Sequence, residues 1–481
     1  MSSTNSPSAD YEAVIGLETH VQLKTKSKMW CACANEFGAP PNSRVCPVCL
    51  GLPGVLPVAN EEALQLTVLA GLLLNCEIPS FAKFDRKNYF YPDMPKNYQI
   101  TQYDKPSTRN GWLDFEFQGR IARVRVTRAH LEEDVGKNSH FDRHSGVDFN
   151  RAGVPLLEIV SEPDITGADM AYEYLNALKE LLIYGGVSDA DMEKGMVRCD
   201  VNVSVRPRGA TELGQKIEIK NMNSFSGARR ALEYEIPRQI GVLTAGGHLR
   251  QETRRWDDQA GITEPMRSKE MAHDYRYFPD PDLMPFEPAP VWLEQVRRRV
   301  VELPLAKKQR LIRDFQLPAA DAQTFVRDAP LGDYFENLAR QSKNPKAVAN
   351  WVINNLRGSL AGSQTTLGDL KFQPEAILEL IALVDAKTIS SSTAQQVFSE
   401  MFDSGRSPRA IVEQKGLAQV SDTSAIEAFC DQAIAANPGP AADYKSGRAA
   451  ALNFLKGQVM KLSKGKANPA LAGEILQRKL N

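Results

Sequence analysis

The alternation of apolar and polar residues predicts strands in the first half of the chain. Residues 200–205 read Asp-Val-Asn-Val-Ser-Val, and residues 216–220 read Lys-Ile-Glu-Ile-Lys. Because successive side chains of a strand point to opposite faces, both segments are predicted to be half-buried strands. Helical periodicity is found at residues 61–74, where Asn60 is the predicted N-cap, and at residues 166–184. Since strands and helices follow each other without a regular βαβ rhythm, the predicted fold class is α+β.

Proline divides the chain into a first part with strands and a helical second part. Five prolines fall within the twelve residues 279–290, which excludes a continuous helix or a central strand there. After residue 291 the apolar residues recur at helical spacing, and strand patterns disappear. A second break, Ser-Gly-Arg-Ser-Pro at residues 404–408, interrupts the helical part. The predicted domains are residues 1–290, 291–405 and 406–481.

Length and composition are those of a globular protein with several domains. The chain has 481 residues, of which 42% are hydrophobic and 24% charged, and this excludes collagen-like, low-complexity and wholly disordered classes. The longest apolar run, residues 64–74, is shorter than the ~20 residues that a membrane span needs. The first residues show neither the basic segment nor the apolar segment of a secretory signal. We therefore expect a cytoplasmic protein with reduced cysteines and no membrane association.

Charge and reactive residues are unevenly distributed, although the net charge is −1. Between residues 443 and 481, eight basic residues stand against two acidic ones, and this excess of six could contact phosphates. A solvated helical face is the alternative. The eight basic residues are Lys445, Arg448, Lys456, Lys461, Lys464, Lys466, Arg478 and Lys479. All six histidines, and every cysteine except Cys430, lie before residue 291, so we expect the chemistry in the first domain.

Four cysteines form two close pairs, Cys31 with Cys33 and Cys46 with Cys49. Each pair can supply two thiolates from one tight turn, and the loop between the pairs can close a tetrahedral zinc site. Four thiolates leave no position open for water, so such a zinc would be structural. The alternative is four core cysteines without a metal.

A second candidate site lies on a strand pattern near the N-terminus. Glu18, His20 and Gln22 alternate with apolar residues, so they share one face of the predicted strand. A carboxylate and an imidazole on one face can reach the same divalent ion. An ordinary exposed strand face is the alternative.

Three further segments place acidic residues within strand patterns. They are residues 130–134 (His-Leu-Glu-Glu-Asp), residues 155–160 (Pro-Leu-Leu-Glu-Ile-Val) and residues 198–203 (Arg-Cys-Asp-Val-Asn-Val). Glu158 is the most informative, because an unpaired carboxylate in an apolar run is costly to bury and needs a metal, a cation or a cavity. Surface salt bridges are the alternative for each acid.

The common phosphate-binding loops, GxxxxGK[ST] and a GxGxxG between a strand and a helix, do not occur in the sequence. A bound nucleotide would therefore be held through metal ions and through Arg or Lys side chains. Lys96 and the pair Arg123 and Arg125 are candidates for such contacts. Solvated strand faces explain the two arginines better, so we assign them no role.

These motifs together resemble the B subunit of the bacterial GatCAB aspartyl/glutamyl-tRNA amidotransferase family. The resemblance rests on the four cysteines and on residues 16–22, 91–102, 130–134, 150–160, 198–203 and 274–282. The segments follow the order of that family over nearly the whole chain.

The resemblance implies a first domain with a cradle related to glutamine synthetase, a mainly antiparallel sheet and an inserted zinc loop. An all-α helical domain and a YqeY-like tail would follow and contact tRNA. The catalytic residues and Mg²⁺ ligands that the resemblance implies are Glu18, His20, Glu133, Glu158 and Asp200. The implied ligands of a structural Zn²⁺ are Cys31, Cys33, Cys46 and Cys49.

The resemblance also implies a reaction and its partners. ATP would phosphorylate the side-chain carboxylate of Glu or Asp misacylated onto tRNA(Gln) or tRNA(Asn), and ammonia would displace the phosphate. The ammonia would come through a tunnel from the A subunit, a glutaminase, and the small C subunit would clamp the other two together. The chemistry is consistent, because a carboxylate is a poor electrophile and an acyl phosphate provides a better leaving group.

Two other functions stay open from the sequence. One is a zinc-bearing RNA-binding scaffold without catalysis, against which metal-dependent ATP turnover would count. The other is a free-standing ligase for a small carboxylic acid, against which a dependence on charged tRNA would count.

Overall fold

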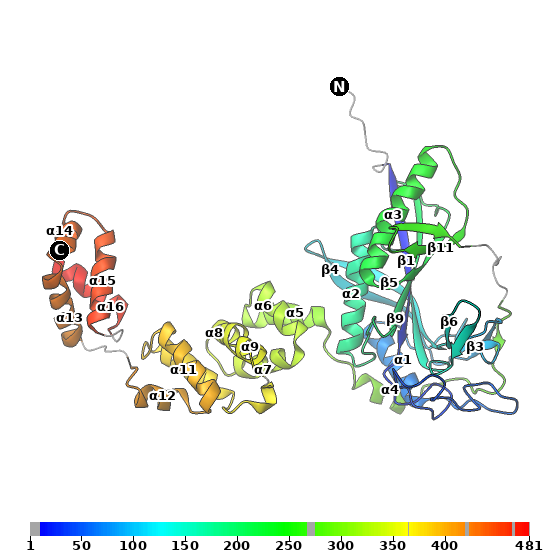
Figure 1. The fold of residues 1–481 in the computed structure, drawn as a ribbon, viewed down its shortest axis with the longest axis horizontal. Helices are drawn as coiled ribbons and strands as arrows, with labels where there is room; N and C mark the ends of the chain where they lie inside the picture. Colours follow the sequence, from blue (N-terminus) through cyan, green and yellow to red (C-terminus); the bar gives the residue numbers. More distant parts are fainter. Residues whose placement is uncertain (1–9, 267–274, 364, 419–422, 464–466, 481) are drawn as a thin grey trace, which may run out of the picture. The chain divides into compact units, whose positions relative to one another are not determined.

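The computed structural model describes residues 10–266, 275–363, 365–418, 423–463 and 467–480 (Figure 1). Asp274, Lys464 and Lys466, on which sequence expectations rest, lie outside these ranges. The chain forms two compact units, Met1–Leu305 and Ala306–Asn481. Of the helices within the described ranges, none has the length and apolar character that crossing a membrane requires.

The first unit is built on an eight-stranded sheet with the order β12-β11-β10-β9-β1-β8-β5-β4. Neighbouring strands are antiparallel except for β10 and β11. The strands are β1 (Tyr11–Gln22), β4 (Thr108–Phe117), β5 (Arg120–Glu133), β8 (Pro155–Ser161), β9 (Val197–Pro207), β10 (Ile217–Met222), β11 (Glu252–Asp257) and β12 (Ile262–Pro265). The strands expected at residues 200–205 and 216–220 are confirmed, and so is the α+β class with a mainly antiparallel sheet.

Three helices pack against the apolar face of this sheet: α1 (Glu61–Leu73), α2 (Ala168–Tyr184) and α3 (Phe225–Thr244). Their side chains form one core with strand residues such as Leu17 of β1, which is 1% exposed. The predicted N-cap Asn60 accepts a hydrogen bond from the backbone N–H of Ala63. Because the helices cover one face, the polar side chains of the same strands gather on the other face.

Smaller elements surround the main sheet. A three-stranded sheet has the order β13-β2-β3 and consists of β2 (Asp85–Asn88), β3 (Tyr98–Thr101) and β13 (Phe278–Pro279). The strands β6 (Lys137–His140) and β7 (Ser145–Asp148) form a hairpin. The four paired cysteines lie in the irregular segment between β1 and α1.

The helix α4 (Pro290–Arg297) follows the proline-rich segment and still belongs to the first core, because Val296 is fully buried there. Arg299, just beyond this helix, forms an ion pair with Glu62 of α1. The first compact unit therefore extends past the predicted boundary at residue 290, to Leu305. The three-domain division stays a prediction.

The described part of the second unit contains helices and no strands, as expected. Its helices are α5 (Pro304–Phe315), α6 (Ala319–Arg327), α7 (Ala329–Ala339), α8 (Pro345–Asn350), the π-helix η2 (Trp351–Leu356), α9 (Arg357–Ala361), the 3₁₀-helix η3 (Leu367–Asp369), α10 (Glu375–Asp385), α11 (Ser391–Ser404), α12 (Pro408–Gln414), α13 (Thr423–Ala436), α14 (Pro438–Lys445), α15 (Ala450–Leu462) and α16 (Pro469–Leu480).

The described residues of this second unit form two separate hydrophobic cores. One includes residues from Leu311 to Val412, and the other includes residues from Ile426 to Leu480. Ile411 and Val412 place α12 in the first of these cores, although the sequence assigned it to the tail. The local break at Gly405, which ends α11 in the left-handed conformation with φ +75°, thus turns the chain without ending the core.

A buried carboxylate ties α3 to the far strands of the sheet. Glu235 is fully buried and accepts hydrogen bonds from Arg238 Nη2 at 2.6 Å, Thr263 Oγ1 at 2.6 Å and Gln239 Nε2 at 3.0 Å. Burial would raise the pKa of Glu235, but these hydrogen bonds hold it below its ordinary value. The charged form of this carboxylate therefore stabilises the fold.

We expect Glu235→Gln to lower the free energy of unfolding at pH 7 by about 1–3 kcal/mol, because charge-assisted hydrogen bonds are lost. The stabilisation is fully present above the unfolded-state pKa of about 4.3 and is lost as the pH falls through the lower folded-state pKa. Urea unfolding of both proteins at pH 7 and near pH 4 measures the difference. Glu233→Gln, at an exposed position of the same helix, is the control. An equal loss in both variants would contradict the assignment.

Candidate active site and zinc loop

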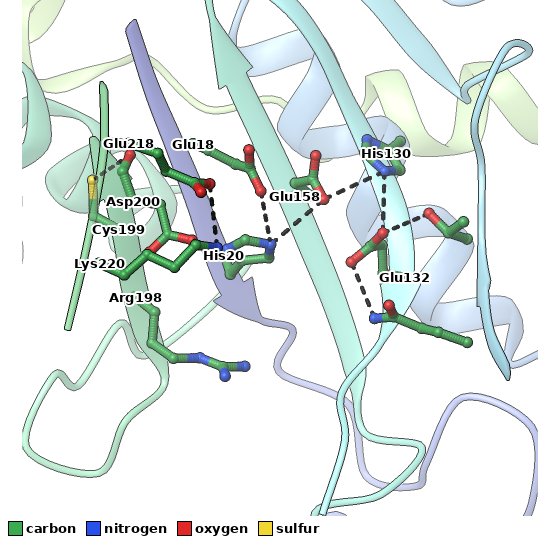
Figure 2. A network of polar contacts seen from close by, with 12 residues as sticks. Glu18, His20, His130, Glu132, Glu158, Arg198, Cys199, Asp200, Glu218 and Lys220 are labelled. Atoms are coloured by element: carbon green, nitrogen blue, oxygen red, sulfur yellow. Dashed lines mark hydrogen bonds and ion pairs between the residues drawn. The ribbon is translucent and has the colours of Figure 1, made fainter. Parts of the chain in front are cut away.

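Acidic side chains and imidazoles gather on the polar face of the central strands (Figure 2). In the strand register, His20 of β1 lies opposite Glu158 of β8, and Glu18 of β1 lies opposite Asp200 of β9. Side chains of directly opposed residues point to the same face of a sheet. The structure therefore brings together four of the five residues that the resemblance implies as Mg²⁺ ligands.

His20 is at the centre of this carboxylate cluster. Its Nε2 lies 3.5 Å from Glu18 Oε1 and 3.5 Å from Glu158 Oε2. Asp200 completes one group with Glu18 and His20, whose ligand atoms all lie within 4.8 Å of one another. The ammonium of Lys220 lies 3.1 Å from Asp200 Oδ2 and balances part of the negative charge.

The structure does not bring Glu133 to the carboxylate cluster. On β5, His130 lies opposite Glu158, so Glu132 shares its face and Glu133 points to the other face. Glu133 is 1% exposed there, and it accepts hydrogen bonds from the Lys96 ammonium and the backbone N–H of Ile100. The alternation of the strand therefore places Glu133 outside the groups of possible metal ligands found among the described residues, and its implied role as a metal ligand stays a prediction.

Glu132, and not Glu133, lies on the polar face, although the resemblance implies Glu133 as the metal ligand. Its carboxylate accepts hydrogen bonds from Thr101 Oγ1 at 2.6 Å and Gln99 Nε2 at 3.1 Å. It forms a second group of possible metal ligands with His20 and Glu158, again within 4.8 Å. The sequence held a signal for this choice, because residue 132 is in phase with His130 and residue 133 is not.

The charges within the cluster shift the pKa values of its members in opposite directions. Burial and the negative charge of Glu158 raise the pKa of Glu18 above its ordinary value. Burial would also raise the pKa of Glu158, but His130 and His20 hold it below its ordinary value. Closely packed carboxylates that repel one another, with an imidazole beside them, suit a divalent cation. The residues present thus fit Mg²⁺.

A cavity of about 210 Å³ opens on the same face, next to the carboxylates. Its lining includes Gly16, two residues before Glu18 on β1, and Asn202, two residues after Asp200 on β9. These two residues lie opposite each other in the strand register. Its lining is mainly apolar and includes Leu213. Such a cavity with a few polar groups suits a planar nucleoside.

The two arginines proposed from the sequence as phosphate contacts are engaged elsewhere. Arg123 forms a salt bridge with Asp114, and Arg125 forms one with Asp164. Both guanidinium groups are well exposed. These contacts favour the alternative, solvated strand faces.

The four cysteines of the zinc loop meet as the spacing suggested. The Sγ atoms of Cys31, Cys33, Cys46 and Cys49 all lie within 4.8 Å of one another. Cys49 Sγ accepts a hydrogen bond from the backbone N–H of Cys46 at 3.1 Å, and the fully buried Lys28 ammonium lies 3.7 Å away. Hydrogen bonding from Cys31 is the largest cause that lowers the pKa of Cys49, and the Lys28 charge adds to it. A thiolate is the form that binds zinc, so the loop fits a tetrahedral Zn²⁺.

Comparison with known proteins identifies similar sequences over almost the whole chain. The family described as the GatB/GatE catalytic domain matches residues 13–294, and the GatB domain family matches residues 333–480. A protein of Carboxydothermus hydrogenoformans, named as the B subunit of aspartyl/glutamyl-tRNA(Asn/Gln) amidotransferase, is 52% identical over 476 residues, which cover 98% of this chain and 99% of that protein. Proteins with the same name from Caldanaerobacter subterraneus subsp. tengcongensis and Moorella thermoacetica are 50% and 49% identical, with 98% of this chain and 99% and 100% of theirs covered.

We expect native protein to contain about one zinc per chain, and Cys46→Ser to lose it, because a tetrahedral site with three thiolates binds zinc much more weakly. Elemental analysis after dialysis against a chelator measures the content. Cys430→Ser, a change of a buried cysteine in the last core, serves as the control and should keep its zinc. The same zinc content in Cys46→Ser and native protein would refute the site.

Proposed function

The chain belongs to the family of aspartyl/glutamyl-tRNA(Asn/Gln) amidotransferase B subunits, and on this premise we propose that its carboxylate cluster amidates Asp or Glu attached to tRNA at the expense of ATP. The observation that carries the proposal is the group of Glu18, His20, Glu132, Glu158 and Asp200 on one sheet face. Such a face can position phosphates through cations without a phosphate-binding loop.

The proposed reaction has two steps. First, an oxygen of the substrate's side-chain carboxylate attacks the γ-phosphorus of ATP, the bond to the β-phosphate oxygen breaks, and ADP leaves. Second, ammonia attacks the carbonyl carbon of the acyl phosphate, phosphate leaves with the bonding electrons, and a proton is lost from nitrogen. Mg²⁺, when bound, supplies positive charge that offsets the charge developing on the transferred phosphoryl group.

The chain's own residues divide the work along the polar face. The carboxylates and His20 hold the cations, and Lys220 limits the repulsion at Asp200. The cavity beside Gly16 and Asn202 accepts the nucleoside of ATP, which places its phosphates toward Glu18 and Asp200. The zinc loop, with a structural Zn²⁺, is connected to the segment before β8 by the Lys28 ammonium, which contacts Cys49 Sγ and donates a hydrogen bond to the carbonyl of Phe149.

The relatives are named as B subunits, which implies that further subunits exist. We propose an amidase-type A subunit that releases ammonia from glutamine, and a small C subunit that joins the other two. The reaction would take place in the cytoplasm, where tRNA is charged. Of the two other functions left open by the sequence, a non-catalytic RNA-binding scaffold does not explain the carboxylate cluster. A ligase for a small carboxylic acid would be active without tRNA.

The tail is proposed to bind tRNA through part of its positive charge. Among the described basic residues between 443 and 481, ion pairs neutralise three: Arg448 with Asp443, Arg478 with Glu427, and Lys479 with Asp431. The contact with phosphates would therefore depend on the remaining lysines of the tail, which include Lys445, Lys456 and Lys461.

In the assembled amidotransferase, Glu158→Gln should reduce tRNA-dependent ATP cleavage by at least about a hundredfold, because a ligand of the cation is lost. Glutamine hydrolysis by the proposed amidase-type partner should persist, since that chemistry lies in another chain. Phosphate release and glutamate release are measured separately. Glu264→Gln, at a half-buried position of β12 that pairs with Arg255, is the control. Near-normal amidation by Glu158→Gln would show that the cluster is not the reaction site.

Removal of residues 423–481 should raise the KM for charged tRNA by about tenfold or more and flatten its dependence on salt, because phosphate contacts are lost. The zinc content should not change, since the last core is separate from the first. Steady-state kinetics at several salt concentrations measure both effects. Unchanged KM and salt dependence would assign the tail to another role.

A further inference from the structure

Four tyrosine rings gather around the three-stranded sheet β13-β2-β3. We call Tyr89, Tyr103, Tyr275 and Tyr277 the tyrosine cluster. The rings of Tyr103 and Tyr277 stack with centroids 4.0 Å apart and an angle of 7° between their planes. Tyr275 packs edge-to-face against Tyr277 at 5.9 Å and against Tyr89 at 6.1 Å. The rings therefore support one another in fixed orientations.

The tyrosine cluster borders the carboxylate cluster. Lys87 of β2 lies opposite Gln99 of β3, and Gln99 donates a hydrogen bond to Glu132. The Lys87 ammonium also lies 5.1 Å from the centroid of the Tyr275 ring. Burial would lower the pKa of Lys87, but the charges of Glu132 and Glu158 raise it, which agrees with this position. Lys87 thus stands between the carboxylates and the tyrosine rings.

The outer ring of the stack is open to a ligand. Tyr103 is 50% exposed, although one face of its ring is covered by Tyr277. Arg86, next to Lys87 on β2, points to the other face of this small sheet, where it contacts Tyr98 and Phe278 and pairs with Asp280, so its charge is not part of the stack. This surface therefore offers planar stacking more than a binding site for phosphate, and every nucleobase has a face that stacks on an aromatic ring.

The chemistry of the proposed substrate requires a nucleoside near this place. In charged tRNA, the amino acid is esterified to the ribose of the terminal adenosine. The reacting carboxylate and that ribose are separated by a single residue, a span of less than about 10 Å. If the side-chain carboxylate of the substrate lies beside Glu132 and Glu158, the terminal adenosine therefore lies at the edge of the carboxylate cluster.

We propose that the tyrosine cluster stacks the terminal adenosine of charged tRNA, with Tyr103 as the ring that contacts the base. This inference rests on the proposed function. In this arrangement the adenine of ATP would have a separate place, because the cavity is lined by residues of β9, β1 and β8, whereas the tyrosine cluster is connected to Glu132 of β5 through Lys87 and Gln99.

The test uses the assembled amidotransferase with Tyr103→Ala, Tyr103→Phe and the control Phe141→Ala. Phe141 is an exposed ring that stacks on His144 at 4.9 Å, in the β6–β7 turn. Tyr103→Ala should raise the KM for charged tRNA about tenfold, which equals about 1.4 kcal/mol and lies within the range of one base stacked on an aromatic ring. Tyr103→Phe and Phe141→Ala should stay within about twofold of wild type. The KM for ATP should not change in any variant.

A second measurement identifies the nucleoside. Uncharged tRNA with and without its terminal adenosine is used as a competitor of charged tRNA. Removal of the adenosine should weaken inhibition of the wild type about tenfold and should make no difference to Tyr103→Ala, because the two changes remove the same contact. The inference is overturned if the KM for tRNA is unchanged in Tyr103→Ala, if the KM for ATP rises instead, or if the variant fails to assemble with its partner chains. Absence of tRNA-dependent amidation in the wild type would refute the proposed function itself.

Discussion

Repulsion between carboxylates on one face of the central sheet is the constraint on which the site depends. Glu18 and Glu158 lie on neighbouring strands with His20 between them, and Asp200 approaches from the other side. Such a group is stable if cations offset its charge, and Lys220 offers a part of that charge. The strands can carry this polar face because their other face is apolar and covered by three helices. Cation binding is thus the role that the geometry favours for these side chains.

The local patterns of the sequence predicted much of the first unit. The strand period of two residues predicts the alternation in β9 and β10 and the shared face of Glu18 and His20. The N-cap at Asn60 follows from its polar side chain directly before a helical pattern. The structure places Glu132 on the face that carries His130 and Glu158, whereas the resemblance implies Glu133 as the ligand, and that role stays a prediction. The hydrophobic core to which α12 belongs is decided by contacts of Ile411 and Val412 with residues far away in the sequence. The local break at residues 404–408 does not reveal these contacts.

Other features of the site could not be predicted, because distant segments form them. The tyrosine cluster joins residues 89 and 103 to residues 275 and 277, and the cavity joins β1, β8 and β9. In the proposed function, these two features flank the carboxylate cluster and receive the two nucleosides of the reaction. ATP and the amino acid would then approach the same cations from opposite sides, which is the arrangement that in-line phosphoryl transfer requires.

The most direct test of this account is a crystal structure of the protein soaked with Mn²⁺, in which anomalous scattering locates the ion. Manganese accepts the oxygen and imidazole ligands expected here and scatters more strongly than magnesium. The account predicts a peak on the polar face, coordinated by His20 together with Glu132 and Glu158, or with Glu18 and Asp200. A peak beside Glu133 on the opposite face, or no peak within the carboxylate cluster, would contradict it.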